Sequence, residues 1–264
     1  MPEEAFDRCI VLEIQHQEGV TMGKAPKDPR EIFQEITEDY KELFGDDLIS
    51  IIIYGSGAGS EYRPGKSDIN FMIVVSEEAI GRLDRAFKTV AKWRKRNVSV
   101  PLFITEQYID TSLDTFPVEY LNFQHNYLVV YGKDILKELT FKTEFLRLQC
   151  EREVKGKLLL LRESFLESAG RAGVLKEVIS QSLRAFIALF RALLFLKGED
   201  MSGDRRQVLA STCRIFDLNQ ELFLRLLDIK EERQKPGKDE IMGLFRDYLA
   251  EIRKLSKTVD ALGG

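Results

Sequence analysis

The chain has few of the residues that build disulfide frameworks and soft-metal sites. Its 264 residues include three cysteines and two histidines. Cys9, Cys150 and Cys213 are widely spaced and odd in number, so we expect neither a disulfide framework nor a cysteine-based zinc site, and a reducing compartment fits. Two histidines, His16 and His125, are too few for a histidine-rich metal site.

The sequence also lacks a strong excess of one charge and a long apolar run. Lys plus Arg number 39 and Asp plus Glu 43, so the net charge is −4 and general electrostatic attraction to nucleic acid is not expected. The most apolar window, residues 186–196, contains Arg191 and is followed by Lys197, which makes it too short and too charged to span a bilayer. The first residues, MPEEAFDR, show no signal peptide. We therefore predict a cytoplasmic protein without membrane or nucleic-acid partners.

Composition and periodicity together predict an α+β protein with two domains. Hydrophobic residues make up 44% and charged residues 31%, a balance typical of globular chains. Before about residue 139, strand-type and helix-type apolar runs alternate, whereas only long helical periods follow. We therefore predict a mixed sheet with flanking helices in residues 1–138 and an all-helical bundle in residues 139–264. Residues 9–14 are compatible with either a strand or a helical turn.

The expected elements follow from apolar spacing and from glycine and proline breakers. In the first domain we expect helices at 28–44 and 77–96 and strands at 48–54, 70–75, 98–105 and 127–131. In the second domain we expect helices at 144–168, 174–197, 205–216, 220–228 and 240–261.

The segment 51–75, IIIYGSGAGSEYRPGKSDINFMIVV, is the most informative part of the chain. A Rossmann loop requires G-x-G-x-x-G before a full helix, but the glycines here form G-x-G-x-G, and Pro64 with Gly65 leaves little room for that helix. A P-loop requires G-x-x-x-x-G-K-[ST], but Ser60 stands at the first glycine position and a strand rather than a helix follows Ser67. Both interpretations are disfavoured, and an unrelated glycine turn stays open.

The same segment carries a family resemblance. One strand ends in Gly55-Ser56, and Ser67-Asp68-Ile69-Asn70 opens the next. Over residues 28–138 this pattern resembles the nucleotidyltransferase superfamily, which includes DNA polymerase beta and kanamycin nucleotidyltransferase. The runs FPVE at 116–119 and YGKD at 131–134 are also similar to bacterial members. The resemblance implies a nucleotidyltransferase-type mixed sheet followed by a helical bundle, as in the kanamycin-type arrangement.

The resemblance also implies roles for particular residues. Loop amides and a serine hydroxyl hold nucleotide phosphates in this superfamily, and paired carboxylates on the second strand bind two Mg²⁺ ions. Residues 68 and 70 lie two apart on an extended chain and so share a face. Asp68 is then the catalytic carboxylate, and Asp68 and Asn70 are the metal ligands. Nucleotide binding is implied for five loop residues: Gly55, Ser56, Arg63, Lys66 and Ser67.

The carboxylate set that the resemblance requires is incomplete. Asn70 offers an amide oxygen but no charge. The third carboxylate belongs on the strand 98–105, where we expect Phe103 at that position and where no residue is acidic. Glu106 follows the strand, and we do not expect it to reach the site. One carboxylate then replaces three, which predicts weak binding of Mg²⁺ with a nucleoside triphosphate and poor two-metal catalysis.

Other charged residues have simpler structural interpretations. Arg184 and Arg191 lie seven residues apart on an expected helix, where a solvated flank is favoured over contact with a nucleotide. A lone His125 after a helical segment is more typical of a structural residue than of a base. The basic cluster KWRKR at 92–96 ends an expected helix, where it complements the helix dipole.

These observations favour a nucleotidyltransferase-fold protein that binds a nucleotide but has a degenerate metal site and weak or no transferase activity. One alternative is an active enzyme that moves a nucleoside monophosphate from a nucleoside triphosphate to a small-molecule or protein acceptor. Another is a non-catalytic interaction module that forms a homodimer or a toxin–antitoxin-like pair through its helical domain.

Overall fold

The computed structural model describes residues 25–263 and divides them into two compact units. The sheet unit comprises residues 25–110 and 126–138, and the helical unit comprises residues 111–125 and 139–263. The segment 111–125 therefore belongs with the helices, although we expected one boundary after residue 138. Cys9 and the segment 9–14 lie outside the described residues.

Hydrogen bonds explain why residues 117–125 join the helical unit. In that unit, α5 (Pro117–His125) packs on α6 (Thr143–Glu167) and α7 (Ala172–Leu196). The buried side chain of Gln149 in α6 accepts a hydrogen bond from Val118 N at 2.8 Å and so satisfies an N–H in the first turn of α5. Asn122 donates to the backbone oxygen of Ala188 at 3.2 Å. These bonds tie a segment from the first half of the chain to two later helices.

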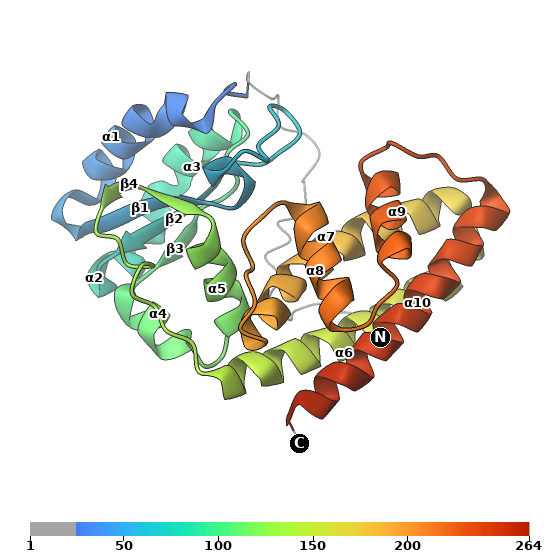
Figure 1. Ribbon diagram of the computed structural model, residues 1–264. Helices are drawn as coiled ribbons and strands as arrows, with labels where there is room; N and C mark the ends of the chain where they lie inside the picture. The colour runs from blue at the N-terminus through green and yellow to red at the C-terminus, as the bar shows by residue number, and fades with distance from the viewer. Residues whose placement is uncertain (1–24, 264) are drawn as a thin grey trace, which may run out of the picture. The chain divides into compact units, whose positions relative to one another are not determined.

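The sheet unit is built on four strands in the order β3-β2-β1-β4. β1 pairs antiparallel with both β2 and β4, whereas β2 pairs parallel with β3 (Figure 1), which confirms the expected mixed sheet. The helix α4 (Glu106–Ser112) follows β3 and crosses into the helical unit. The other elements of this unit are η1 (Pro29–Ile32), α1 (Phe33–Phe44), η2 (Gly45–Asp47), β1 (Leu48–Tyr54), η3 (Gly55–Ala58), β2 (Asn70–Val75), α2 (Glu77–Ile80), η4 (Leu83–Ala86), α3 (Phe87–Arg94), β3 (Leu102–Ile104) and β4 (Tyr127–Gly132).

Two of the expected elements are shorter than their apolar patterns suggest. The helix expected at 77–96 is divided into α2, η4 and α3, because Gly81 follows α2 and Arg82 leaves helical geometry with φ −131° and ψ 39°. The strand expected at 98–105 keeps only the ladder Leu102–Ile104, together with an isolated bridge from Val98 to Ile69. Pro101 lies between them and has no N–H to give to a ladder.

The core of the sheet unit lies between one face of the sheet and the helices α1 and α3. Alternate residues of β2 point to this face: Phe71, Ile73 and Val75 are fully buried among the residues of the two helices. Phe71 contacts Phe33 of α1 edge to face, with the ring centroids 6.4 Å apart. The other residues of β2 therefore face the opposite side of the sheet.

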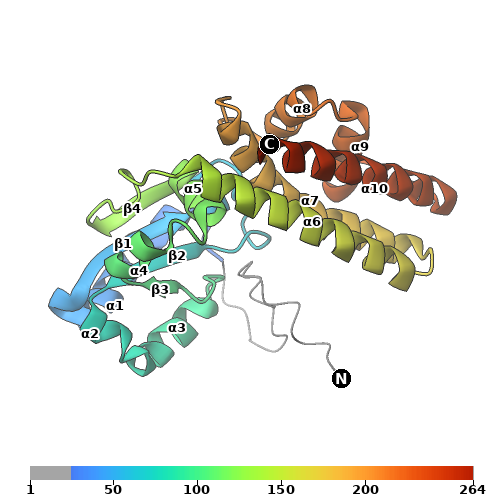
Figure 2. The ribbon, with the colours of Figure 1, turned by 90° about the horizontal axis from the view of Figure 1, so that it is seen from below.

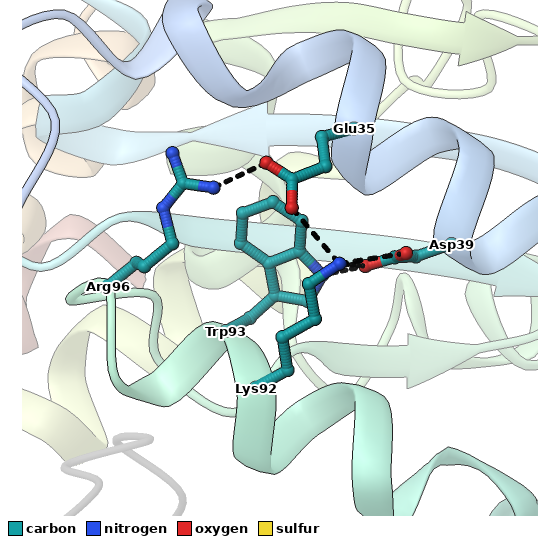
Figure 3. A network of polar contacts seen from close by, with 5 residues as sticks. All are labelled: Glu35, Asp39, Lys92, Trp93 and Arg96. Carbon is teal, nitrogen blue, oxygen red and sulfur yellow. Dashed lines mark hydrogen bonds and ion pairs between the residues drawn. The ribbon is translucent and has the colours of Figure 1, made fainter. Parts of the chain in front are cut away.

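A polar network joins the solvent edges of α1 and α3 (Figure 3). Asp39 accepts hydrogen bonds from Trp93 Nε1 at 2.8 Å and from Lys92 Nζ at 2.7 Å. Glu35 lies 3.0 Å from Lys92 and 2.5 Å from Arg96. The hydrogen bonds from Lys92 and then Arg96 lower the pKa of Glu35. The basic cluster at 92–96 therefore has two of its four cations paired with carboxylates of α1.

The helical unit confirms the expected bundle after residue 139. Its long helices α6, α7 and α10 run side by side (Figure 2), and α7 also packs on α8 and α9. The whole of α7, unlike the shorter window 186–196, is long and apolar enough to cross a membrane by length and composition alone. Half of its most apolar window is buried, as in the central helix of a packed bundle. Both described cysteines, Cys150 and Cys213, are buried free thiols in this unit. The remaining elements are α8 (Arg205–Ile215), α9 (Gln220–Lys230), α10 (Lys238–Asp260) and η5 (Ala261–Gly263).

Candidate functional site

The residues of the glycine loop meet at one end of the sheet, where β1 finishes and β2 begins. Because the two strands are antiparallel and Tyr54 pairs with Asn70, the chain leaves β1 at Gly55 and returns beside it at Asn70. The intervening residues 55–69 form one long connection that carries Ser56, Asp68 and the loop cations. The fold thus places the two halves of the sequence motif next to each other.

Gly55 takes a backbone conformation that favours glycine. Its φ is +68°, in the left-handed region, and a Cβ at this position would lie 3.9 Å from the side-chain nitrogen of Asn70. The chain then makes the 3-10 turn η3, in which Gly57 is buried. A Cβ on Gly57 would lie 3.1 Å from the side chain of Ile53. Glycine at these two positions therefore lets the turn sit close to the end of the sheet.

Asn126 holds the beginning of this loop through both its backbone and its side chain. Gly55 N donates to the backbone oxygen of Asn126 at 3.0 Å, and Asn126 Nδ2 donates to the backbone oxygen of Gly55 at 2.8 Å. A Cβ on Gly59 would come within 3.1 Å of the same Asn126 side chain. The sequence analysis did not find Asn126, because nothing in the residues around it marks it as a partner of the loop.

The second half of the loop is a closed turn. Ser67 Oγ accepts a hydrogen bond from Arg63 N at 3.1 Å, and Ser67 N donates to the backbone oxygen of Arg63 at 2.8 Å. The buried side chain of Asn97 anchors this turn by donating to the backbone oxygen of Ser67 at 2.7 Å. Arg63 and Lys66 are exposed at its surface. The Ser67 hydroxyl thus accepts a hydrogen bond within the turn, while the side chains of Arg63 and Lys66 lie in solvent.

Asp68 and Asn70 lie on the face of the sheet that is turned away from α1 and α3. Ile69 between them is fully buried in the core on the helix side, so alternation directs its two neighbours to the opposite face. Both side chains are half-buried. Tyr54, the cross-strand partner of Asn70, shares this face, and burial raises the pKa of its hydroxyl to about 12. Asp68 and Asn70 therefore share a face as expected from their spacing.

The structure does not bring Phe103 to this face. Phe103 pairs with Ile73 in the parallel ladder, and its ring lies 6.0 Å from that of Tyr40 and 5.9 Å from that of Phe44, both in α1. Its side chain is therefore part of the core on the helix side, opposite to Asn70. The expectation that Phe103 occupies the third-ligand position is therefore wrong. Alternate residues of a strand point to opposite faces of the sheet, and Phe103 points to the face that Asp68 and Asn70 do not share.

The register of β3 indicates a different position for the third ligand. Leu102 pairs with Met72, which shares the face of Asn70, so Leu102 is the ladder residue of β3 on that face. Before Leu102 this alternation is broken, because Pro101 interrupts the ladder and Val98 bridges Ile69 on the core side. Leu102 carries no charge, and the site keeps Asp68 as its carboxylate.

The donor set of this site fits one Mg²⁺ ion better than two. Asp68 supplies one charged oxygen donor and Asn70 one neutral oxygen, and Mg²⁺ is commonly held by one or two carboxylates together with substrate phosphates. Within residues 25–263 no group of three or more His, Cys, Asp or Glu side chains is arranged to hold a metal ion. A metal at this site would therefore depend on phosphate oxygens for most of its negative ligands.

Comparisons with known proteins add little to the assignment of this site. No family model and no curated protein matches the sequence. Nine solved chains match its structure, among them a spectinomycin adenyltransferase from Enterococcus faecialis solved with ATP and spectinomycin. The two proteins share 12% sequence identity with a TM-score of 0.47, over 83% of this chain and 98% of the other. A likeness at this level assigns no activity to the chain.

Other candidate residues have structural partners within their own units. Glu106 opens α4 and forms an ion pair with Lys133 at 2.5 Å. Glu119 in α5 accepts a hydrogen bond from Gln149 at 2.7 Å, and burial raises the pKa of its carboxyl group. Burial, and then the charge of Arg191, lowers the pKa of His125. None of these contacts is with the residues of the glycine loop.

Proposed function

We propose that the sheet unit binds a nucleoside triphosphate at the loop 55–70 and that the protein is of nucleotidyltransferase type with weak or no transferase activity. The observation that carries this proposal is the junction of β1 and β2. Left-handed Gly55 opens the loop there, and Asp68 and Asn70 return beside it on one face. A pre-formed turn that presents amides, a carboxylate and nearby cations in one place is suited to a phosphate–magnesium group.

The loop supplies the contacts that a triphosphate requires. The hydroxyl and amide of Ser56 follow the left-handed turn, and Asn126 fixes the backbone from which they project. Arg63 and Lys66 are exposed cations on the second half of the loop, where they would offset phosphate charge. Because Asn126 and Asn97 already hold the two ends of the loop, little ordering entropy remains to be lost on binding.

The same site explains why transfer would be inefficient. Two-metal phosphoryl transfer relies on one ion that activates the attacking hydroxyl and another that stabilises the leaving group. Asp68 with phosphate oxygens is enough for one ion, whereas Asn70 and Leu102 bring no charge to a second. Metal positioning accounts for much of the rate in phosphoryl transfer, so losing one ion reduces turnover by orders of magnitude.

Calorimetric titration of the full chain with ATP, in Mg²⁺ and in EDTA, tests this proposal. We expect weak Mg²⁺-dependent binding that Asp68→Asn abolishes and that Gly55→Ala reduces, since alanine is strained at φ +68°. Asp46→Asn is the matched control: Asp46 is an exposed carboxylate before β1, at the other end of that strand, and its loss should leave binding unchanged. Equal binding by wild type and Asp68→Asn would contradict the proposed site.

Transfer assays separate the proposal from its alternatives. Wild-type protein that moves labelled nucleoside monophosphate from ATP to a small-molecule or protein acceptor at an ordinary enzymatic rate would establish an active transferase. Absence of any nucleotide binding, with the protein folded, would favour a non-catalytic interaction module instead.

A further inference from the structure

The helix α6 presents apolar residues to solvent as well as to the core. Seven large hydrophobic residues are exposed in the part of the chain that the structure describes, and four of them lie on α6: Leu148, Leu159, Leu160 and Leu166. The helix also has a fully packed side, where Leu146, Cys150 and Val154 are buried against the bundle. The outer side of this helix therefore combines exposed leucines with charged residues and offers apolar surface to a partner.

Six outer residues of α6 form one narrow stripe that contains both leucines and charged residues. At 100° per residue, the six residues fall within an arc of about 80° on the side of the helix opposite its buried face. Arg152 and Glu163 are exposed, and neither is in a salt bridge within residues 25–263. Gly156 is near the middle of the stripe, and a Cβ there would meet nothing within 4 Å. The stripe consists of Leu148, Arg152, Gly156, Leu159, Glu163 and Leu166.

The order of these residues is complementary to itself in the antiparallel direction. About a two-fold axis between residues 157 and 158, Arg152 lies opposite Glu163 of a second copy, and Gly156 lies opposite Leu159. Under the same two-fold symmetry, Leu148 of one copy lies within one residue of the position opposite Leu166 of the other. A parallel pairing would instead put Arg152 against Arg152 and Glu163 against Glu163, which like-charge repulsion disfavours.

We propose that α6 is a dimerisation surface on which a second copy of this chain packs its own α6 in the antiparallel direction. Leu159 of each copy fills the space over Gly156 of the other, and two Arg152–Glu163 ion pairs flank the centre. Such an interface rests on one helix per copy, so it belongs to the small interfaces and its occupancy depends on protein concentration. The inference does not depend on nucleotide binding by the sheet unit.

Light scattering after size-exclusion chromatography, over a roughly hundredfold range of concentration, tests the proposal on the full chain. The wild type should shift from the monomer mass of 30.4 kDa toward twice that mass. Leu159→Glu should stay monomeric with an unchanged melting temperature, because Leu159 is half-exposed. Phe87→Glu is the matched control: it makes the same change at a residue that is 72% exposed in the sheet unit, and it should dimerise normally.

Charge reversal tests the direction of the pairing. Arg152→Glu or Glu163→Arg alone should weaken dimerisation by about three- to tenfold, since each places like charges opposite each other twice. The double variant Arg152→Glu with Glu163→Arg should restore it. A wild type that is monomeric at every concentration, or a dimer that survives Leu159→Glu, would overturn the proposal. Single reversals without effect would overturn the antiparallel register.

Discussion

Restoring the missing charge on the correct face of the sheet should strengthen binding of Mg²⁺-ATP. The double variant Asn70→Asp with Leu102→Asp places two new carboxylates on the face that already carries Asp68, because Leu102 pairs with Met72 and so shares the face of Asn70. Asn70→Asp with Phe103→Asp places one carboxylate there and sends the other into the core beside α1. The two variants have the same net charge and differ only in the face of the sheet on which the second new carboxylate lies.

The size of the gain follows from the expected charge separations. A carboxylate about 4 Å from a cation contributes roughly 4 kcal/mol at an effective dielectric constant near 20. Mutual repulsion of three carboxylates and their desolvation remove much of this gain. Leu102 is half-buried, so solvent partly screens the new charge. We therefore expect a net gain of about 1.4 kcal/mol, which corresponds to tenfold tighter binding.

The Phe103 variant should lose stability and gain less affinity than the Leu102 variant, because only one of its new carboxylates lies on the face of Asp68. Phe103 is half-buried and packs against Tyr40 and Phe44, so losing its ring should cost less than the roughly 3–5 kcal/mol of a fully buried phenylalanine, with an added cost for a carboxylate in an apolar site. Phe103→Leu is the matched control for the lost ring, since it keeps an apolar side chain. Its melting temperature should lie between those of the wild type and the Phe103→Asp variant.

Calorimetric titration and melting temperatures, each with Mg²⁺-ATP and with ATP in EDTA, measure these effects. The Leu102 variant should show a larger Mg²⁺-dependent shift in melting temperature than the wild type, because ligand binding stabilises the folded state by mass action. A larger gain in the Phe103 variant than in the Leu102 variant would refute the assignment of faces. Equal ligand shifts in both variants and the wild type would refute the idea of an incomplete metal site.

Three further predictions concern stability. Asp39→Ala should lower the free energy of unfolding by about 1–3 kcal/mol in urea titrations, because the buried Trp93 N–H loses its acceptor; an unchanged value would show that water replaces the carboxylate. Burial lowers the pKa of Lys230 to about 8 in the folded protein, below its ordinary value of 10.5. Between these pH values only the unfolded chain keeps the proton, so the free energy of unfolding of the wild type should rise relative to that of Lys230→Met as the pH rises above 8. A difference between the two free energies that does not change with pH would contradict this. Gly132→Ala should lower the melting temperature, because Gly132 has φ +80° and a Cβ there would collide with a backbone oxygen of β1. Gly243→Ala, where a Cβ on α10 would meet open space, should instead raise the melting temperature by the equivalent of about 1 kcal/mol.

The elements that sequence periodicity predicts well are those whose pattern is long or clearly of one type. The helices α6 to α10 extend over many turns with apolar residues at helical spacing, and the structure places them within a few residues of the expected bounds. The continuous run LISIIIY matches β1 over its full length. In contrast, one helix was expected to begin at residue 77, whereas α3 begins ten residues later at Phe87. Apolar residues on both sides of Gly81 keep helical spacing, although the backbone leaves helical geometry at Arg82.

The features that sequence analysis missed depend on contacts between distant segments. The bond from Asn126 to Gly55 joins residues 71 positions apart, so no local pattern marks Asn126 as part of the loop. The face of Phe103 is set in the same way. The run VSVPLFIT is apolar at nearly every position and shows no alternation that would distinguish its two faces. Its parity is fixed only when β3 pairs with β2 and Phe103 comes beside Ile73.

Moving the third-ligand position from Phe103 to Leu102 leaves the conclusion about charge unchanged, and the reason is compositional. The run 98–105 contains no acidic residue, so no assignment of faces or register supplies a carboxylate from this strand. The acidic residues that follow begin with Glu106, which opens α4 and is paired with Lys133. A third carboxylate would have to come from an element other than β3. The absence of a carboxylate on this strand was therefore predictable from the sequence, whereas the strand residue that shares the face of Asn70 required the register.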